Sequence, residues 1–156
     1  MNKECLACKY QKEPRFEILR TDHWNVVLDT NQAYLGRSYL TLLTHKGSLA
    51  SLNDEEWRGY EEIVRKLEKT YKEVYGAEPL NWCCFMNNAF RTEPFNPHVS
   101  WQIYPRYKIA PVVDGIAFDD PRFGEFFDDD ARKVVSDETV EHIASKLRDH
   151  LASLVS

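Results

Sequence analysis

The sequence NPHVSWQIYPR, residues Asn96–Arg106, carries the clearest structural signal in this chain. Polar and apolar residues alternate within it, as they do in a β-strand that buries one face. Successive side chains of a strand point to opposite faces, so His98, Ser100 and Gln102 share one face. The apolar residues between them share the other. We therefore predict a strand over Val99–Tyr104, opened by His98, with Ser100 and Gln102 on the same face as that histidine.

Four more runs of apolar and β-branched residues precede this strand and are also predicted as strands. They are Phe16–Arg20, Trp24–Asp29, Ser38–Thr44 and Leu80–Met86. Only a short polar turn separates the first two, which is typical of neighbouring antiparallel strands in a hairpin.

Two amphipathic helices are predicted as well. The first covers Asp54–Tyr75, where Asn53 can cap the N-terminus, Glu56 can complete a capping box and Gly76 can end the helix. The second covers about Glu138–Leu154 and has apolar residues at helical spacing on one face.

Hairpins followed by a helix and a further hairpin are typical of the α+β class. We expect one domain over residues 1–156, with a five-stranded antiparallel sheet and two main helices. Residues 105–135 are rich in Asp, Pro and Phe and are expected to be largely loop, and residues 136–156 form the C-terminal helix.

Composition narrows the function classes. The chain has 156 residues, of which 43% are hydrophobic, and 25 acidic against 20 basic residues give a formal charge of −5. That balance argues against a long nucleic acid as partner, because such partners need an extended basic surface. No apolar run approaches the roughly 20 residues of a membrane helix, and the start MNKEC has no apolar signal segment. We expect a cytoplasmic protein with no membrane partner, in a reducing compartment where disulfides are rare, so its 4 cysteines need another explanation.

A metal site is the simplest explanation for two of those cysteines. Cys5 and Cys8 have the C-x₂-C spacing that lets two thiolates bind one tetrahedral zinc ion. The same spacing occurs in redox pairs, but those usually lie between a strand and a helix of a larger α/β unit. His45 and His98 stand at the ends of predicted strands, where their side chains can meet the thiolates. The sequence therefore predicts a zinc site made of these four residues.

Cys83 and Cys84 are the rival ligands. They are adjacent in an apolar strand, so their side chains point to opposite faces and do not chelate one ion together. We interpret them as buried, hydrophobe-like cysteines.

Several segments together resemble the histidine-triad (HIT) superfamily. They include VVLD at Val26–Asp29, Gly36, TLLTHK ending around His45, Asn87, and the pattern His-φ-Ser-φ-Gln-φ-φ that starts at His98, where φ is apolar. The family pattern is His-φ-His-φ-His-φ-φ. The preceding Asn-Pro and the final Gln are particularly similar to galactose-1-phosphate uridylyltransferases.

The resemblance implies a fold with a five-stranded antiparallel sheet, frequent homodimers and nucleotide or related phosphoester ligands. Zinc-bearing members use two cysteines, a histidine at the position of His45 and the first triad histidine, and all four are present here. In active members the middle triad histidine attacks the α-phosphorus of a nucleotide. By position, the resemblance implies catalytic roles for Ser100 and Gln102. It also implies a nucleotide-binding set of Asp29, Asn87, Gln102 and Arg106.

Three departures from the family bear on activity. The middle histidine is Ser100, and a serine hydroxyl needs a general base to attack phosphorus. The Gly-rich phosphate cradle is replaced by Ala89–Phe95, which has no glycine and contains an acid and a proline. Arg37 stands where many members have histidine.

These observations favour a zinc-containing, HIT-like nucleotide-binding protein that lacks the standard reaction. One alternative is a HIT-type nucleotide hydrolase or nucleotidyltransferase that acts on nucleoside phosphoesters through altered chemistry. The other is a zinc-stabilised scaffold that binds a protein partner.

Overall fold

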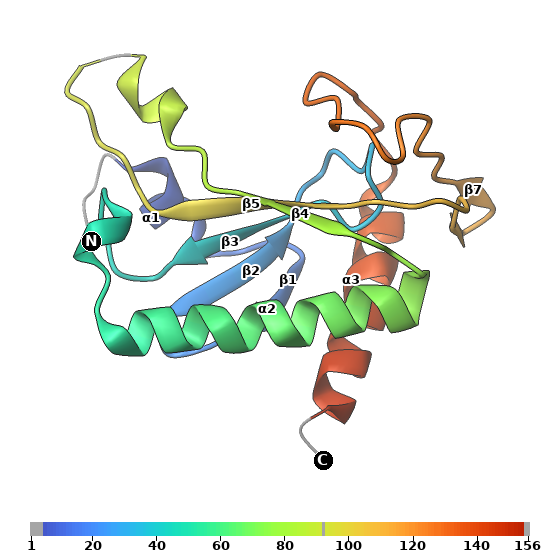
Figure 1. Ribbon diagram of the computed structural model, residues 1–156, viewed down its shortest axis with the longest axis horizontal. Helices are drawn as coiled ribbons and strands as arrows, with labels where there is room; N and C mark the ends of the chain where they lie inside the picture. The colour runs from blue at the N-terminus through green and yellow to red at the C-terminus, as the bar shows by residue number, and fades with distance from the viewer. Residues whose placement is uncertain (1–4, 92, 155–156) are drawn as a thin grey trace.

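A computed structural model describes residues 5–91 and 93–154, and it confirms the α+β class with a five-stranded antiparallel sheet. The strands of the sheet lie in the order β1-β2-β3-β5-β4 (Figure 1). Their bounds are β1 Glu17–Arg20, β2 Trp24–Leu28, β3 Ser38–Leu42, β4 Leu80–Cys83 and β5 Ser100–Pro105. Each predicted strand is therefore present, and no strand end differs from its predicted position by more than three residues.

The long helix α2, Asp54–Tyr75, has the predicted bounds. The Asn53 side chain accepts from the backbone N–H of Glu56, whose carboxylate accepts from the backbone N–H of Asn53. The predicted capping box is thus confirmed, and Gly76 ends the helix in the left-handed conformation at φ 74°. Lys46 also pairs with Glu56 at 2.6 Å, which fixes the start of the helix beside the end of β3.

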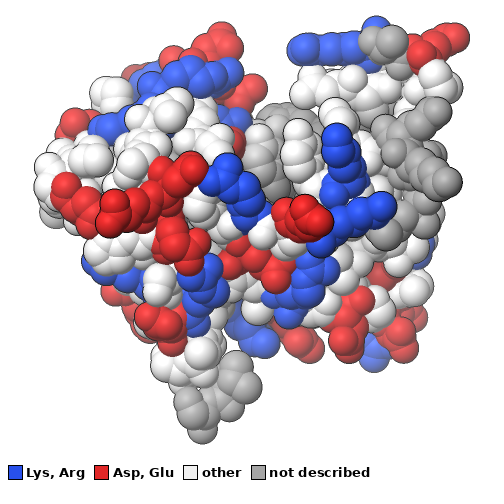
Figure 2. All heavy atoms as spheres, turned by 180° about the vertical axis from the view of Figure 1, so that it is seen from behind, with Lys and Arg blue, Asp and Glu red and all other residues white. Residues whose placement is uncertain are grey.

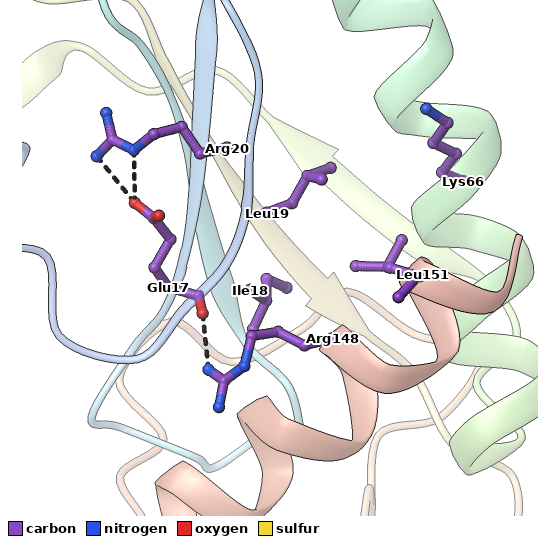
Figure 3. A pocket seen from close by; sticks show the side chains of 8 residues that line it. Glu17, Ile18, Leu19, Arg20, Lys66, Arg148 and Leu151 are labelled. Carbon is purple, nitrogen blue, oxygen red and sulfur yellow. Dashed lines mark hydrogen bonds and ion pairs between the residues drawn. The ribbon is translucent and has the colours of Figure 1, made fainter. Parts of the chain in front are cut away.

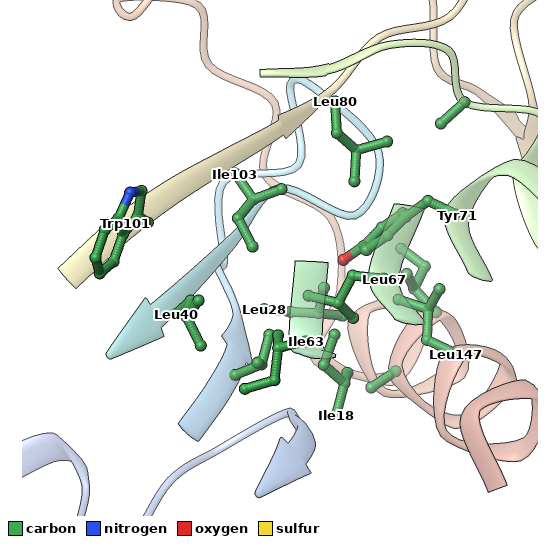
Figure 4. Close-up of a cluster of buried hydrophobic side chains, with 14 of the residues drawn as sticks. Ile18, Leu28, Leu40, Ile63, Leu67, Tyr71, Leu80, Trp101, Ile103 and Leu147 are labelled. Atoms are coloured by element: carbon green, nitrogen blue, oxygen red, sulfur yellow. The ribbon is translucent and has the colours of Figure 1, made fainter. Parts of the chain in front are cut away.

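Helix α2 runs across one face of the sheet, and α3, Asp137–Ser153, packs against α2 and β1 (Figure 1). The hydrophobic core lies between these elements, where side chains from both helices meet the inner side of the strands (Figure 4). Its members include Leu40, Trp101 and Ile103 from the sheet and Ile63 and Leu67 from α2. Burial of this apolar surface is the main stabilising contribution to the fold.

The opposite face of the sheet carries the polar residues of the strands. In β5 the residues Ser100 and Gln102 are only partly buried, whereas Trp101 and Ile103 are in the core. The register places Tyr39 of β3 and Cys83 of β4 on either side of Gln102. We call the surface made by Tyr39, Cys83, Ser100, Gln102 and Tyr104 the polar face.

Besides two 3-10 turns, Leu49–Ser51 and Asn87–Phe90, a short helix and a small hairpin were not predicted. Residues 6–10 form the helix α1, Leu6–Tyr10, and the expected loop 105–135 contains a small hairpin of β6, Val112–Val113, and β7, Ile116–Ala117. Both lie in segments with little hydrophobic periodicity, which is why sequence patterns do not reveal them. Among the described residues, no helix combines the length and the apolar character that crossing a membrane requires.

Candidate metal centre and the adjoining polar face

The structure brings the four predicted metal ligands together. Cys5 stands at the N-terminal end of α1 and Cys8 lies inside that helix, so one helical turn points both thiols the same way. His45 follows β3 and His98 precedes β5, and these neighbouring antiparallel strands deliver the two imidazoles to the same end of the sheet. The four possible ligand atoms all lie within 4.8 Å of one another.

The distances within this cluster fit a tetrahedral ion. His98 Nδ1 lies 3.3 Å from Cys5 Sγ and 3.5 Å from Cys8 Sγ, and His45 Nδ1 lies 3.4 Å from Cys8 Sγ. The two Nδ1 atoms are 3.2 Å apart. Bonds of about 2.3 Å to sulfur and about 2.0–2.1 Å to nitrogen give ligand separations of about 3.6 Å and about 3.3 Å at a tetrahedral angle. The residues present therefore fit such an ion with no rearrangement of the backbone.

The second nitrogen of His98 fixes the orientation of its ring. Its Nε2 lies 2.6 Å from the backbone carbonyl of Leu42, so the ring donates there and presents the Nδ1 lone pair to the cluster. Burial lowers the pKa of His98 by more than this carbonyl raises it, so the ring is neutral near pH 7. A neutral imidazole held in one tautomer is the form that binds a metal.

The two other cysteines lie outside this cluster. Cys84 packs against the hydrophobic core, as expected for a hydrophobe-like cysteine. Cys83 faces the other way, and burial together with the carboxylate of Asp129 raises the pKa of its thiol. Neither thiol is therefore poised as a thiolate.

The predicted catalytic residues Ser100 and Gln102 follow the metal cluster along β5. Within residues 5–91 and 93–154, no histidine or carboxylate forms a hydrogen bond with the Ser100 hydroxyl, and His98 has both ring nitrogens engaged. The Gln102 side chain has two partners: its Oε1 accepts from Arg37 Nη2 at 3.0 Å and lies 2.5 Å from the Tyr104 hydroxyl oxygen. The arrangement fixes the orientation of the Gln102 amide and gives Ser100 no general base.

Asp29, implied as a ribose ligand, lies at the end of β2 near this group. Its Oδ2 accepts from the Tyr39 hydroxyl at 3.2 Å and lies 3.1 Å from Arg37 Nε, and its Oδ1 accepts from the backbone N–H of Asn31 at 3.1 Å. Arg37 therefore joins Asp29 to Gln102, two residues that are distant in the sequence. The side chain of Asp29 is 15% exposed, which leaves part of the carboxylate accessible.

Asn87 and Arg106 lie in different surroundings. Asn87 is exposed at the start of a short 3-10 helix, Asn87–Phe90, beyond the end of β4. Arg106 is buried, and its guanidinium binds Asp120 in a bidentate pair and also donates to the Asn81 side chain and to the carbonyls of Glu125 and Arg122. All five N–H groups of Arg106 are thereby used inside the chain, so the structure gives it a different role from the one that the resemblance implies. It anchors the 105–135 segment to the end of β5.

In the described part of the loop Ala89–Phe95, the backbone N–H groups of Ala89 and Arg91 donate to the carbonyls of Met86 and Asn88. Thr92 lies outside the described residues. The rings of Phe90 and Phe95 meet at 5.3 Å, and each ring is about half exposed.

Two residues that contact Arg37 or Gln102 were not predicted from the sequence: Tyr104, on the polar face, and Asp129, beside it. The Tyr104 hydroxyl donates to Asp129 Oδ1 at 2.7 Å, and Phe127 stacks on the Tyr104 ring at 4.0 Å. Burial and the hydrogen bond to Asp129 raise the pKa of Tyr104, so its hydroxyl stays protonated. The alternation of His98, Ser100 and Gln102 extends to Tyr104 and was the available signal for that residue. Asp129 gives none, because it lies in an irregular segment.

A separate pocket of about 340 Å³ lies between β1, α2 and α3 (Figure 3). Two of its three cations are already paired: Arg20 with Glu17, and Arg148 with the Glu17 carbonyl and with Glu141. None of its lining residues belongs to the predicted site.

Comparison with known proteins supports the fold. No model of a known protein family matches the sequence, and no curated protein matches it. Solved structures do match. A Zn-bound histidine triad family protein from Mycobacterium smegmatis shares 18% identity over 97% of this chain and 96% of that one, with a TM-score of 0.64. A hypothetical histidine triad nucleotide-binding protein from Sulfolobus tokodaii shares 16% identity over 96% and 93%, with a TM-score of 0.67.

A uridylyltransferase also matches, with 16% identity over 97% of this chain but only 46% of its own length, and a TM-score of 0.67. At these identities the likeness concerns the fold, and the five-stranded antiparallel sheet of this chain is the one that the resemblance implied. This chain therefore has the fold of the histidine-triad proteins.

Proposed function

We propose that this chain holds one zinc ion, binds a nucleotide or related phosphoester on its polar face, and does not carry out the nucleotidyl-histidine reaction. The observation that carries this proposal is the order of side chains along β5. A metal ligand, His98, comes first, then Ser100 without a base, then Gln102 held by Arg37. This order supports a metal site beside a polar surface that can bind a ligand, without a histidine nucleophile between them.

Zinc is the metal that the donor set favours. Two thiolates and two imidazoles in tetrahedral spacing are typical of structural zinc sites. The structural match to a Zn-bound histidine triad protein supports the same choice. Four protein ligands leave no open position, so the ion would stabilise the fold and would not activate water.

Loss of the standard reaction follows from the chemistry of the triad positions. An imidazole at position 100 would be a nucleophile near pH 7, whereas an unassisted serine hydroxyl is a poor one. His98 is not available as a substitute, because one ring nitrogen faces the metal cluster and the other binds Leu42.

Nucleotide binding is supported by the polar groups near the end of β2. Asp29 offers carboxylate oxygens to ribose hydroxyls, and Gln102 offers an amide to a phosphate or sugar oxygen. Asn87 remains in the proposed binding set as an exposed amide. We leave Arg106 out of this set, because its donors are used within the chain.

The surface agrees with a small ligand more than with a long nucleic acid. Acidic and basic side chains alternate over the face that Figure 2 draws, without a continuous basic track. We further propose a homodimer, which the position of β4 at an edge of the sheet supports, and a cytoplasmic location, which cysteines without disulfide bonds support.

A thermal-shift screen tests this function. The zinc-loaded chain is mixed with nucleosides, nucleoside monophosphates and sugar nucleotides, and each hit is followed by chromatographic analysis of products. A shift without product supports the proposal. Product that disappears in Ser100→Ala would favour the hydrolase or transferase alternative. No shift with any compound would favour the partner-binding scaffold, for which the exposed rings of Phe90 and Phe95 offer an apolar surface.

A further inference from the structure

We infer that Arg37 and Tyr104 form an anion subsite that the chain's own Asp129 fills, and that a phosphate group of the ligand replaces the Asp129 carboxylate. The inference deepens the proposed function, on which it rests for the identity of the ligand, by naming what replaces the lost phosphate cradle.

Arg37 is a buried cation with hydrogen-bond donors that have no acceptor among the described residues. It is 6% exposed, and its guanidinium lies 4.6 Å from the centre of the Tyr104 ring. Within the part of the chain that the structure describes, Nη1 and Nε are buried and donate no hydrogen bond, although Nε lies 3.1 Å from Asp29. A guanidinium offers five N–H donors in a planar fork that suits two oxygens of one anion. Buried donors without acceptors are costly, so this fork favours a better acceptor than it has now.

Asp129 is the present acceptor, and it is weakly held. Its Oδ1 lies 3.4 Å from Arg37 Nη2, which is long for a charge-assisted hydrogen bond. Its other contact is the Tyr104 hydroxyl at 2.7 Å, but that hydroxyl has a single proton, and Gln102 Oε1 also lies within reach of it. Two acceptors thus compete for one donor. The Asp129 carboxylate therefore shows where an oxygen of an anion can bind. It does not satisfy all the hydrogen-bond donors of Arg37.

The surrounding backbone lets Asp129 leave without opening the loop. The Tyr34 hydroxyl accepts from the backbone N–H of Asp128 at 2.7 Å, and Asn31 binds the carbonyl of Ala131 at 3.0 Å and the N–H of Lys133 at 3.0 Å. These bonds hold the segment on both sides. The side chain of Asp129 is nevertheless 63% exposed, so a rotation about its own bonds is enough to move the carboxylate into water.

Space for a ligand exists on the same side of the sheet. A pocket of about 500 Å³ lies between β4 and residues 124–127, and its lining includes Asn81, Cys83 and Phe127. Asn81 and Cys83 are the register partners of Tyr104 and Gln102. Phe127 is the ring that stacks on Tyr104. If a phosphate binds at Arg37, the nucleoside of the same ligand can bind at Asp29, and the rest of the ligand can enter this pocket.

Asp129→Asn is the direct test, because it removes the competing charge and keeps the shape. Adenosine, uridine, their 5′-monophosphates and inorganic phosphate are titrated by calorimetry into zinc-loaded protein. We expect the monophosphates to bind about tenfold more tightly to Asp129→Asn than to the unmodified chain, the size of one charged hydrogen bond regained. Nucleoside affinity should stay unchanged. Asp130→Asn is the matched control: it removes the same charge one residue away, where the carboxylate makes no ion pair with Arg37.

A second variant separates this subsite from a general charge effect. Adding Tyr104→Phe to Asp129→Asn keeps the ring and removes the hydroxyl donor, and it should abolish the gain. Arg37→Lys serves the same purpose with the charge retained and the planar fork lost.

The outcomes distinguish the two proposals. If nucleosides bind but Asp129→Asn and Asp130→Asn bind monophosphates alike, the anion subsite is refuted and nucleotide binding survives. If no nucleoside or nucleotide binds, yet Asp129→Asn binds inorganic phosphate in a Tyr104-dependent way, the subsite survives and the proposed ligand is wrong. Absence of any phosphate binding in Asp129→Asn overturns the inference.

Discussion

Replacing Cys8 with serine tests the metal centre most directly. In this cluster the ion would join a segment near the N-terminus to histidines that are 37 and 90 residues away in the sequence. Serine is a much weaker zinc ligand than a thiolate, so the variant should lose the ion at ordinary zinc concentrations. The stability that zinc supplies should be lost with it.

The size of the effect follows from linkage. When the free zinc concentration is about 1,000 times the dissociation constant, binding of the ion stabilises the folded chain by about 4.1 kcal/mol. For a chain of 156 residues, each kcal/mol corresponds to about 2–4 °C in melting temperature. We therefore expect Cys8→Ser, or removal of zinc with a chelator, to lower the melting temperature by about 8–16 °C. The variant should still fold, because the hydrophobic core between α2 and the sheet contains none of the four ligands.

Differential scanning calorimetry and metal analysis measure the two sides of this prediction. The unmodified chain should carry about one zinc per molecule. Cys84→Ser is the matched control, because it changes the same atom in a thiol outside the cluster. It should retain the ion. Metal-free protein that melts at the same temperature as the loaded protein would refute the reasoning.

Three other changes test the polar face and the fold. The unmodified chain should not cleave diadenosine polyphosphates, nucleoside phosphoramidates or sugar nucleotides in chromatographic assays, and Ser100→His should restore at most weak turnover. Rapid turnover that Ser100→Ala abolishes would contradict this. Asp29→Asn should raise the dissociation constant for nucleosides about tenfold by calorimetry, the loss of one charged hydrogen bond, and an unchanged constant would remove Asp29 from the binding set. Gly36→Ala places a Cβ 2.3 Å from Cε1 of the buried Tyr71 at a φ of +78°. The free energy of unfolding of this variant should fall by about 2 kcal/mol or more in urea titrations. A fall under about 0.5 kcal/mol would mean that the Tyr71 ring simply moves aside.

Local signals made much of this architecture predictable. The helix Asp54–Tyr75 was predicted to the residue because its cap, capping box and terminal glycine all lie within the helix or next to it. The strand around Trp101 was predicted because alternation is a property of consecutive residues. The thiol pair Cys5 and Cys8 was also predictable from neighbouring residues, because its C-x₂-C spacing is local and one helical turn holds both ligands.

Motif resemblance carried the prediction further than local physics. Nothing near His45 or His98 in the sequence shows that the two imidazoles meet at 3.2 Å. Their places at the ends of predicted strands suggested one site, the HIT pattern supported it, and the antiparallel pairing of β3 with β5 brings them together in the structure.

By itself, the sequence determined the two long helices, the alternation of the strands and the chemistry available for a metal, because each of these depends on residues close together along the chain. Only the tertiary structure decided which polar groups satisfy one another. The resemblance placed Arg106 among ligand-binding residues, but its guanidinium donates to Asp120 and to the Arg122 carbonyl in the segment that follows β5. Arg37 meets Asp129 across 92 residues of sequence. A buried guanidinium takes the acceptors that folding brings within about 3 Å, and no local pattern specifies which distant loop supplies them.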